Sequence, residues 1–407
     1  MNDRLDQSGA AFPCKASLAY EDALEILSQE ARPLGPEVLA LDLAAGRRLA
    51  EPVIAGIDGP RWDCAAMDGY AVRNSDLKAG VRRFSKLGPV VAGDPVPGSI
   101  GERSAMRVMT GAPLPPDADR VIMIELCREN SETVEIAVPT GKPHVRRRGS
   151  DFQSGQRLLD IGRELTPAAL VAAAAGDNSH VAVWRQARMH IVATGDELVP
   201  PGKAANTSDR IPDSLSAAIR QMSCQWGSAQ VRCTRTGDDP AAIRRAFSEE
   251  DDLTVIVGGA SRGDRDFARA ALIPCGLRLF FADVAMKPGK PSWYGKAGRS
   301  HILGLPGNPT AALTVARLFL APLLVGLGGG EPRSALLWKD QRVARDIVSQ
   351  GDREAFLIGD VVDGAAFPLE RQEASAQHLL GQATILIRRP AHAAASPQGS
   401  LVPVLPL

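Results

Sequence analysis

Short apolar runs alternate with helical patterns between residues 189 and 329, and this alternation restricts the fold more than any other feature of the chain. The strand-like runs include MHIVATGDEL, AQVRCTRTGDD and LTVIVGGASRGD, and the helix-like segments include DSLSAAIRQMSCQWG, PAAIRRAFSEE and PGNPTAALTVARLFLAPLLVGLGG. Repeated strand–helix units predict a mostly parallel, doubly wound sheet with helices on both faces, the last helix being amphipathic. Ligands of such sheets bind beyond the carboxyl ends of the strands, where conspicuous loops of this chain lie.

Two further helices are predicted upstream of these units. Residues 18–31 have apolar positions at helical spacing. The alanine-rich stretch 166–177 begins with Thr166, a favourable N-cap, followed by Pro167 at the first helical position. Both segments therefore predict helices outside the strand–helix region.

Two other regions are rich in short β-like runs. Between about residues 53 and 140 these runs are separated by Gly, Pro and Asp clusters, which indicates a compact β-rich module. Gly328–Pro332 is a plausible linker, and the runs LIGDVV and ATILIRR that follow it imply a small separate β domain. A chain of 407 residues is expected to hold several domains.

Composition disfavours several classes of partner. The 47 basic residues balance the 47 acidic ones, and only 4% of residues are aromatic, so neither nucleic acid nor an anionic membrane is an expected ligand. The N-terminus has no apolar signal region and no stretch of about 18 apolar residues occurs, which predicts a cytoplasmic protein. The cysteines form no CxxC pair and predict reduced thiols rather than a zinc site: Cys14, Cys64, Cys127, Cys224, Cys233 and Cys275.

Three turn-rich strings combine charged side chains with glycine and proline. They are DCAAMDGYAVR at 63–73, ATGDELVPPG at 193–202, and MKPGKP with GLPGNP within 286–309. Glycine and proline fix sharp turns and let backbone N–H groups approach a phosphate or oxyanion, so the strings predict local anion sites. The glycine loop after Val257 lacks the trailing Lys-Ser/Thr of a P-loop, and no GxGxxG opens a helix after the first strand of a βαβ unit. GTPase, kinase and dehydrogenase chemistry are therefore disfavoured.

The motifs of this chain, taken in order, resemble those of the molybdopterin molybdenumtransferase family, which includes bacterial MoeA and the E domain of gephyrin. The similar strings are AMDGYAVR, TGAPLP followed by a strand ending in Glu125, RRRG-x-D, TGDEL, a GG-x-S-x-GD-x-D loop, KPGKP and LPGNP. They cover most of residues 15–330.

The resemblance implies a multidomain α/β and β fold, in an elongated homodimer. It implies a discontinuous helical/linker domain at 15–52 and 141–180, a β-rich inserted domain at 53–140, a doubly wound α/β molybdopterin-binding domain at 181–330 and a C-terminal β-barrel at 334–407. The implied reaction joins molybdate to adenylylated molybdopterin, releases AMP and uses a divalent cation such as Mg²⁺. Molybdopterin adenylyltransferase or a recipient molybdoenzyme are the implied protein partners.

By this resemblance, three groups of residues form the site. The catalytic candidates are Asp68, Thr110, Asp151, Glu197, Lys287 and Lys290. The binding candidates are Arg146, Gly258, Gly259, Ser261, Pro306, Gly307, Asn308 and Pro309. The metal candidates are Glu197, Asp238, Asp264 and Asp266, because carboxylate oxygens suit Mg²⁺.

Structural readings of the same residues stay open. Asp68 would also suit an Asx turn, and the arginine run 146–148 would suit a solvated face. Glu197 would suit the first turn of a helix, and Asn308 would suit a helix N-cap.

Several positions depart from the family pattern, which has Asn at Leu215, Ser at Val257 and a base at Asp283. Arg262 replaces Val in the glycine loop and Ser150 replaces Glu before Asp151. Losing a lysine charge at Asp283 should weaken anion binding unless Arg262 compensates. The alternative function is therefore a weakened relative that binds molybdopterin as a chaperone or scaffold. A third reading, the adenylylation of molybdopterin, is disfavoured by the β-rich insertion and the KPGKP segment.

Overall fold

The computed structural model describes residues 17–137, 141–259, 267–375 and 377–407. By its internal contacts the chain divides into two compact units. One consists of Met1–Pro36 with Trp184–Leu407, and the other is the intervening segment Glu37–Val183.

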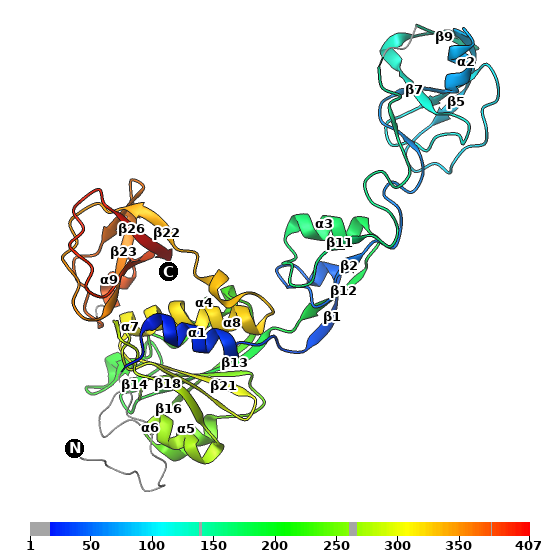
Figure 1. The fold of residues 1–407 in the computed structure, drawn as a ribbon. Helices are drawn as coiled ribbons and strands as arrows, with labels where there is room; N and C mark the ends of the chain where they lie inside the picture. The colour runs from blue at the N-terminus through cyan, green and yellow to red at the C-terminus, as the bar shows by residue number, and fades with distance from the viewer. Residues whose placement is uncertain (1–16, 138–140, 260–266, 376) are drawn as a thin grey trace. The chain divides into compact units, whose positions relative to one another are not determined.

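The first unit contains a six-stranded sheet, of which β13, β16, β18 and β21 are labelled in Figure 1. The strand order is β16-β13-β17-β21-β20-β18. The strands are β16 (Ser228–Thr236), β13 (Ala187–Thr194), β17 (Leu253–Val257), β21 (Ser300–Leu305), β20 (Trp293–Ala297) and β18 (Arg278–Ala282). The first four are parallel, whereas β20 runs antiparallel to both of its neighbours. The predicted mostly parallel sheet is confirmed, with one antiparallel strand, β20, next to the edge strand β18.

Helices cover both faces of this sheet, as the strand–helix alternation predicts. One face carries α1 (Tyr20–Glu30), α4 (Ser216–Gln225) and the long helix built from α7 (Pro309–Val315), a π-helical turn (Ala316–Leu320) and α8 (Ala321–Leu327). The other face carries α5 (Pro240–Ala246) and α6 (Phe267–Leu272). Two apolar cores therefore lie on opposite sides of one sheet.

The long helix Pro309–Leu327 differs from its sequence prediction. It is apolar and long enough to cross a membrane, but 89% of its most apolar window is buried inside the protein, as in the core helix of a globular domain. The prediction that this helix is amphipathic is wrong, because the protein covers it on nearly every side. Within Pro309–Leu327 only Leu313 and Val325 are partly exposed.

A second sheet of the same unit has the order β19-β23-β25-β26-β22, with β24 paired to β23. Its strands are β19 (Met286–Lys287), β22 (Lys339–Arg342), β23 (Glu354–Val362), β24 (Ala365–Pro368), β25 (Ile385–Arg389) and β26 (Leu401–Pro406). A short helix α9 (Gln377–Leu380) lies between β24 and β25. The pairing of β19 with β23 joins a segment of the α/β region to the C-terminal strands.

The second unit holds a six-stranded sheet in the order β7-β4-β6-β5-β9-β8. Its strands are β4 (Gly69–Val72), β5 (Arg83–Val90), β6 (Ser104–Val108), β7 (Arg120–Met123), β8 (Cys127–Glu129) and β9 (Thr133–Ile136), with α2 (Asn74–Lys78) between β4 and β5. The expected strand end at Glu125 is wrong, because Glu125 lies in a 3₁₀ turn, Ile124–Leu126.

The remaining elements are three short strand pairs, a 3₁₀ turn at Leu41–Leu43 and one α-helix. The pairs join β1 (Pro36–Ala40) to β12 (His180–Trp184), β2 (Val53–Ile54) to β11 (Arg157–Leu159), and β3 (Cys64–Ala65) to β10 (Val145–Arg146). Helix α3 (Pro167–Ala175) begins as predicted, since the Thr166 side chain accepts a hydrogen bond from the Ala169 amide. The domain boundaries given above stay predictions.

Candidate active site

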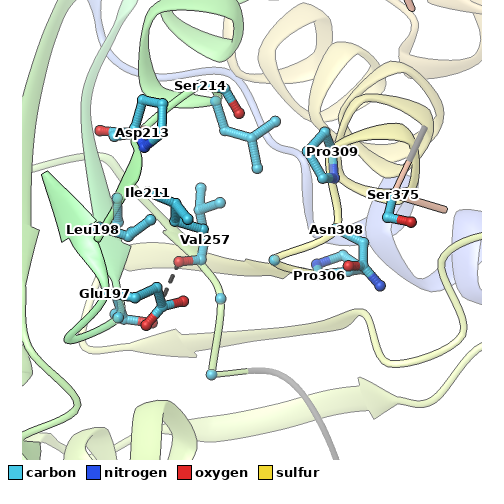
Figure 2. A pocket seen from close by; sticks show the side chains of 18 of the residues that line it. Glu197, Leu198, Ile211, Asp213, Ser214, Val257, Pro306, Asn308, Pro309 and Ser375 are labelled. Atoms are coloured by element: carbon cyan, nitrogen blue, oxygen red, sulfur yellow. Dashed lines mark hydrogen bonds between the residues drawn. The ribbon is translucent and has the colours of Figure 1, made fainter. Parts of the chain in front are cut away.

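A cavity of about 600 Å³ opens at the carboxyl ends of the parallel strands. It is lined by the loops that follow β13, β16, β17 and β21, together with the segment 211–215 that precedes α4 and the segment around Ser375 (Figure 2). The strand order places β16 and β17 on opposite sides of β13, so the chain reverses direction across the sheet at this point. This is where open α/β sheets bind their ligands.

The floor of the cavity depends on glycine where β13 and β17 end. The Thr194 hydroxyl donates a hydrogen bond to the Val257 carbonyl over 3.3 Å. Gly258 follows with φ +93°, and a Cβ there would lie 2.7 Å from the Thr194 carbonyl oxygen. Gly307, from the loop after β21, also approaches closely, since its Cβ would lie 3.5 Å from Gly258 Cα. The backbone amides of these loops can therefore approach a ligand without obstruction by side chains.

Two candidate metal ligands reach this cavity. Glu197 and Asp238 both line it. Asp196 lies beside them, and its Oδ1 accepts the Asp238 amide over 3.2 Å. Glu197 precedes β14 (Leu198–Val199) rather than a helix, so its reading as a helix first-turn acid is wrong.

The wall beside these carboxylates is apolar. Leu198, Ile211, Leu215 and Val257 all line the cavity, and Leu215 and Val257 are buried. Leu215 immediately precedes α4, and Val257 is the last residue of β17. Two of the positions that depart from the expected family pattern therefore lie in the site itself, where they contribute apolar side chains.

The loop after β21 supplies the opposite wall. Pro306, Gly307, Asn308 and Pro309 all line the cavity, and Asn308 and Pro309 face Leu198 and Ile211 across it in Figure 2. Asn308 occupies the N-cap position of α7 but its side chain makes no capping hydrogen bond. The capping reading of Asn308 is therefore wrong, and the residue lines the cavity instead.

A second cavity, of about 570 Å³, shares Pro291, Pro306 and Asn308 with the first. Lys287 and Lys290 line it from the KPGKP turn. Its other wall comes from the C-terminal region and adds positive and negative side chains: Arg353, Glu370, Arg371 and Glu373. Arg371 pairs with Glu373 at 3.1 Å. The two cavities together place glycine loops and carboxylates beside a cluster of cations.

Sequence reasoning missed the C-terminal contribution to these walls. Arg353, Arg371, Gln372 and Ser375 lie in segments with no distinctive motif. The sequence offered one indication of this contribution. Arg353 in GDREAF precedes a β-like run, and a basic residue at the start of a strand can face a neighbouring loop.

Asp68 and Thr110, in the second unit, are brought together. Asp68 Oδ1 accepts hydrogen bonds from the Thr110 amide and hydroxyl, both over 2.7 Å. Hydrogen bonds from Thr110 hold the pKa of Asp68 below its ordinary value, so this exposed carboxylate is anionic at neutral pH. Gly69 is required here, since a Cβ would lie 1.8 Å from the Ile122 carbonyl oxygen.

The arginine run is partly structural. Arg147 pairs with Asp63 at 2.5 Å and Arg148 pairs with Asp58 at 2.6 Å. Arg146 lies in β10 opposite Cys64, and Asp151 donates its amide to the Gly59 carbonyl. Among the described residues the ion pairs thus use Arg147 and Arg148, while the side chains of Arg146 and Asp151 are exposed.

Some predicted residues lie outside the described part of the chain: Ser261, Arg262, Asp264, Asp266 and Cys14. Their proposed roles stay predictions, as does compensation for Asp283 by Arg262. Asp283 itself has φ +62° and its carbonyl accepts the Leu18 amide. Within the described ranges, no cluster of three or more His, Cys, Asp or Glu side chains is suited to holding a metal ion. The described cysteines are free thiols.

Comparison with known proteins gives a consistent result. Residues 18–176 match the family described as MoeA N-terminal region (domain I and II), and residues 190–325 match the family described as probable molybdopterin binding domain. A molybdopterin molybdenumtransferase of Haemophilus influenzae is 35% identical over 310 residues, which cover 75% of this chain and 76% of that protein. One of Synechococcus elongatus is 34% identical over 76% of this chain and 80% of its own length.

Solved structures agree with these sequence matches. The molybdopterin biosynthesis MoeA protein from Pyrococcus horikosii superimposes with a TM-score of 0.81. It is 26% identical, and the match covers 96% of this chain and 99% of that one. The MoeA-like fold predicted from the motifs is confirmed.

Proposed function

This chain belongs to the MoeA family of molybdopterin molybdenumtransferases, and from that premise we propose that it inserts molybdenum from molybdate into adenylylated molybdopterin and releases AMP. Membership assigns the protein a role in molybdenum cofactor biosynthesis. The observation that carries the proposed reaction is the junction of two cavities, since one is suited to a pterin phosphate and the other to a small oxyanion.

The first cavity suits the adenylylated pterin. Leu198, Ile211, Leu215 and Val257 form an apolar wall against which a flat ring can pack. The Gly258 amide itself donates to the Leu305 carbonyl over 3.1 Å, but the glycine loops at the strand ends would let a phosphoanhydride approach neighbouring backbone donors. Substrate orientation would thus come from one wall and phosphate binding from another.

The second cavity suits molybdate, which is a substrate. Lys287 and Lys290 on the KPGKP turn present two ammonium groups. Arg353, the residue just before β23, adds a guanidinium. Charge-assisted hydrogen bonds to an oxyanion are stronger than neutral ones. This cluster would hold molybdate beside the pterin and stabilise charge as the bond to AMP breaks.

A Mg²⁺ ion fits the donor set of the first cavity. Glu197 and Asp238 are carboxylates on one wall, and Mg²⁺ commonly takes one or two carboxylates with substrate phosphates. When bound, the ion would neutralise charge on the phosphoanhydride. Asp264 and Asp266 complete the proposed set, and Asp68, Thr110, Arg146 and Asp151 are proposed to act from the second unit within a homodimer.

Purified protein should be mixed with adenylylated molybdopterin, Mg²⁺ and micromolar molybdate. AMP release and formation of cofactor that reconstitutes an apo-molybdoenzyme are then followed. Molybdate-dependent release of AMP is the expected result. Tight pterin binding without AMP release would instead assign the chaperone or scaffold function, which the apolar Leu215 and Val257 favour because they remove hydrogen-bonding groups from the site.

A further inference from the structure

The position of Lys287 in the second cavity is set by a very short strand. Strand β19 contains only Met286 and Lys287, and it pairs with Glu354 and Ala355 at the start of β23. Arg353, which lines the same cavity, immediately precedes this pairing. A two-residue ladder has few hydrogen bonds, so its geometry needs support from outside the ladder.

Glu354 supplies that support through its side chain. Its carboxylate is largely buried and lies 2.5 Å from Arg388 Nε. The same guanidinium reaches Glu21 of α1, with Nη2 to Oε1 at 2.6 Å. Arg388 therefore uses two edges of its fork to tie the start of β23 to a helix of the α/β core.

The guanidinium is also fixed from its faces. It lies 5.3 Å from the centre of the Tyr20 ring and 5.6 Å from that of Trp338. Tyr20 in turn packs edge-on against Phe319 and Phe356, with ring centres 5.6 and 5.0 Å apart. Arg388 thus sits in a rigid aromatic setting rather than on a mobile surface.

The network extends beyond Arg388 along α1. Arg333 pairs with Glu21 at 3.0 Å and with Glu25 at 3.1 Å. Glu21 is therefore held by two arginines, one from the C-terminal sheet and one from the segment after α8. Burial raises the pKa of Glu354 above its ordinary value, although its hydrogen bond with Arg388 opposes the shift. The pKa of Glu21 is lowered instead, because hydrogen bonds from Arg333 and Arg388 outweigh its partial burial.

Stability alone is a weak reason for such an arrangement. Well-packed apolar residues can often replace a buried ion pair without loss of stability. A fork that bonds two carboxylates at once, by contrast, fixes direction as well as distance. The arrangement has a geometric consequence for the second cavity. Arg388 holds the carboxylate of Glu354, and Glu354 lies between Arg353 and Ala355, the residue that pairs with Lys287.

We propose that Arg388 is a positioning residue for the oxyanion site: through Glu354 and Glu21 it holds the start of β23 so that Arg353 and Lys287 converge on one anion. Arg388 does not touch the substrate. The inference rests on the proposed function, since it assigns molybdate to the second cavity. It predicts that molybdate affinity depends on the Arg388 network, while pterin binding in the first cavity does not.

The test uses the full chain with Arg388→Met, Arg388→Lys and Glu354→Gln. Arg388→Met should raise the KM for molybdate by about tenfold or more while kcat changes little, because it misaligns a binding group. Arg388→Lys keeps the charge but loses the fork, so it should fail to restore the KM. Arg342→Met is the matched control, since Arg342 lies on β22 of the same sheet and donates to the Gly399 carbonyl.

A second measurement does not need turnover. Amide hydrogen exchange within 286–291 and 354–357 should be faster in Arg388→Met and Glu354→Gln, with the amides of β13 and β17 unchanged. An unchanged KM for molybdate in an active Arg388→Met protein would overturn the proposal, as would unchanged exchange in both variants. Glu354→Gln serves where Arg388→Met does not fold.

The two proposals fail differently. Wild-type protein that neither turns over nor binds tungstate, an oxyanion probe of the same shape and charge, would refute the proposed function and the assignment of molybdate to this cavity. Faster amide hydrogen exchange in Arg388→Met and Glu354→Gln would then show that the Arg388 network supports the β19–β23 pairing but has no role in binding an oxyanion. Tungstate binding that is equal in wild type and Arg388→Met would overturn the positioning role while leaving the proposed function intact.

Discussion

Gly258 shows how a single residue can decide whether the site forms. Its φ of +93° disfavours any other residue, and a Cβ there would lie 2.7 Å from the Thr194 carbonyl oxygen and 2.9 Å from the Thr194 hydroxyl. Gly258→Ala should therefore shift the β13 and β17 loops and lower kcat/KM by about a hundredfold. Steady-state AMP release measures the effect.

Gly276→Ala is the matched control for backbone strain. Gly276 has φ +80°, but no atom lies within 4 Å of the position its Cβ would take. This variant should lose about 1 kcal/mol of stability and retain its activity. Equal losses of activity in the two variants would show that backbone strain, and not the close approach to Thr194, explains the effect at Gly258.

The buried side chain of His301 should make the stability of the fold decrease at acidic pH. It is buried, its Nδ1 lies 2.7 Å from the Tyr294 hydroxyl, and burial lowers the pKa of its imidazole to about 3. An unfolded histidine takes up a proton below about pH 6.5 and the folded one does not, so stability falls as pH drops from 6.5 towards 3. His301 should cost the fold about 2 kcal/mol at pH 5 relative to pH 8.

Urea unfolding at pH 5 and pH 8 tests this difference. His301→Gln should reduce the pH dependence by the stated amount, whereas His378→Gln, which alters an exposed histidine, should leave it unchanged. The same loss of stability at pH 5 in the wild type and in His301→Gln would contradict the assignment. His190, also buried and with a pKa lowered by burial, contributes in the same direction and stays constant in the comparison.

At the scale of elements, the sequence predicts what local patterns encode. The strands β13, β16 and β17 and the N-cap of α3 follow from periodicity and capping residues, and the structure confirms them. The predicted amphipathic helix at Pro309–Leu327 failed because its polar residues, such as Thr314 and Arg317, are themselves buried. Arg317 donates to the Pro406 carbonyl over 2.6 Å, a tertiary contact that no local pattern contains.

The candidate site was predictable to the extent that it lies in turns. Glu197, Gly258 and Asn308 were predicted from the family motifs TGDEL, GG-x-S-x-GD-x-D and LPGNP, and their loops follow strands of the predicted doubly wound sheet. The contribution of Arg353 was missed because it depends on pairing between β19 and β23. A strand of two residues has no detectable period, and its partner lies far along the chain, so only the folded structure reveals it.

At the scale of the whole molecule, the second unit is an insertion within the first. The chain leaves the first unit after Pro36 and returns at Trp184. The Arg185 amide donates to the Gly35 carbonyl over 3.1 Å, so the two crossing points are adjacent. Among the described residues, none of Glu37–Val183 belongs to the α/β sheet or lines either cavity.

This architecture allows the two groups of proposed site residues to be separated. Replacing Glu37–Val183 with a short Gly-Ser linker should leave the first unit folded, because its cores and cavities are its own. Adenylylated molybdopterin should then bind with near-normal affinity, measured by calorimetry. Molybdate-dependent AMP release should be lost, because Asp68, Thr110, Arg146 and Asp151 would be absent.

Asp68→Asn and Asp151→Asn in the full chain are the controls, since they remove the carboxylate charges and keep the second unit. AMP release that survives the deletion would exclude a catalytic role for all four residues and confine the chemistry to the α/β unit.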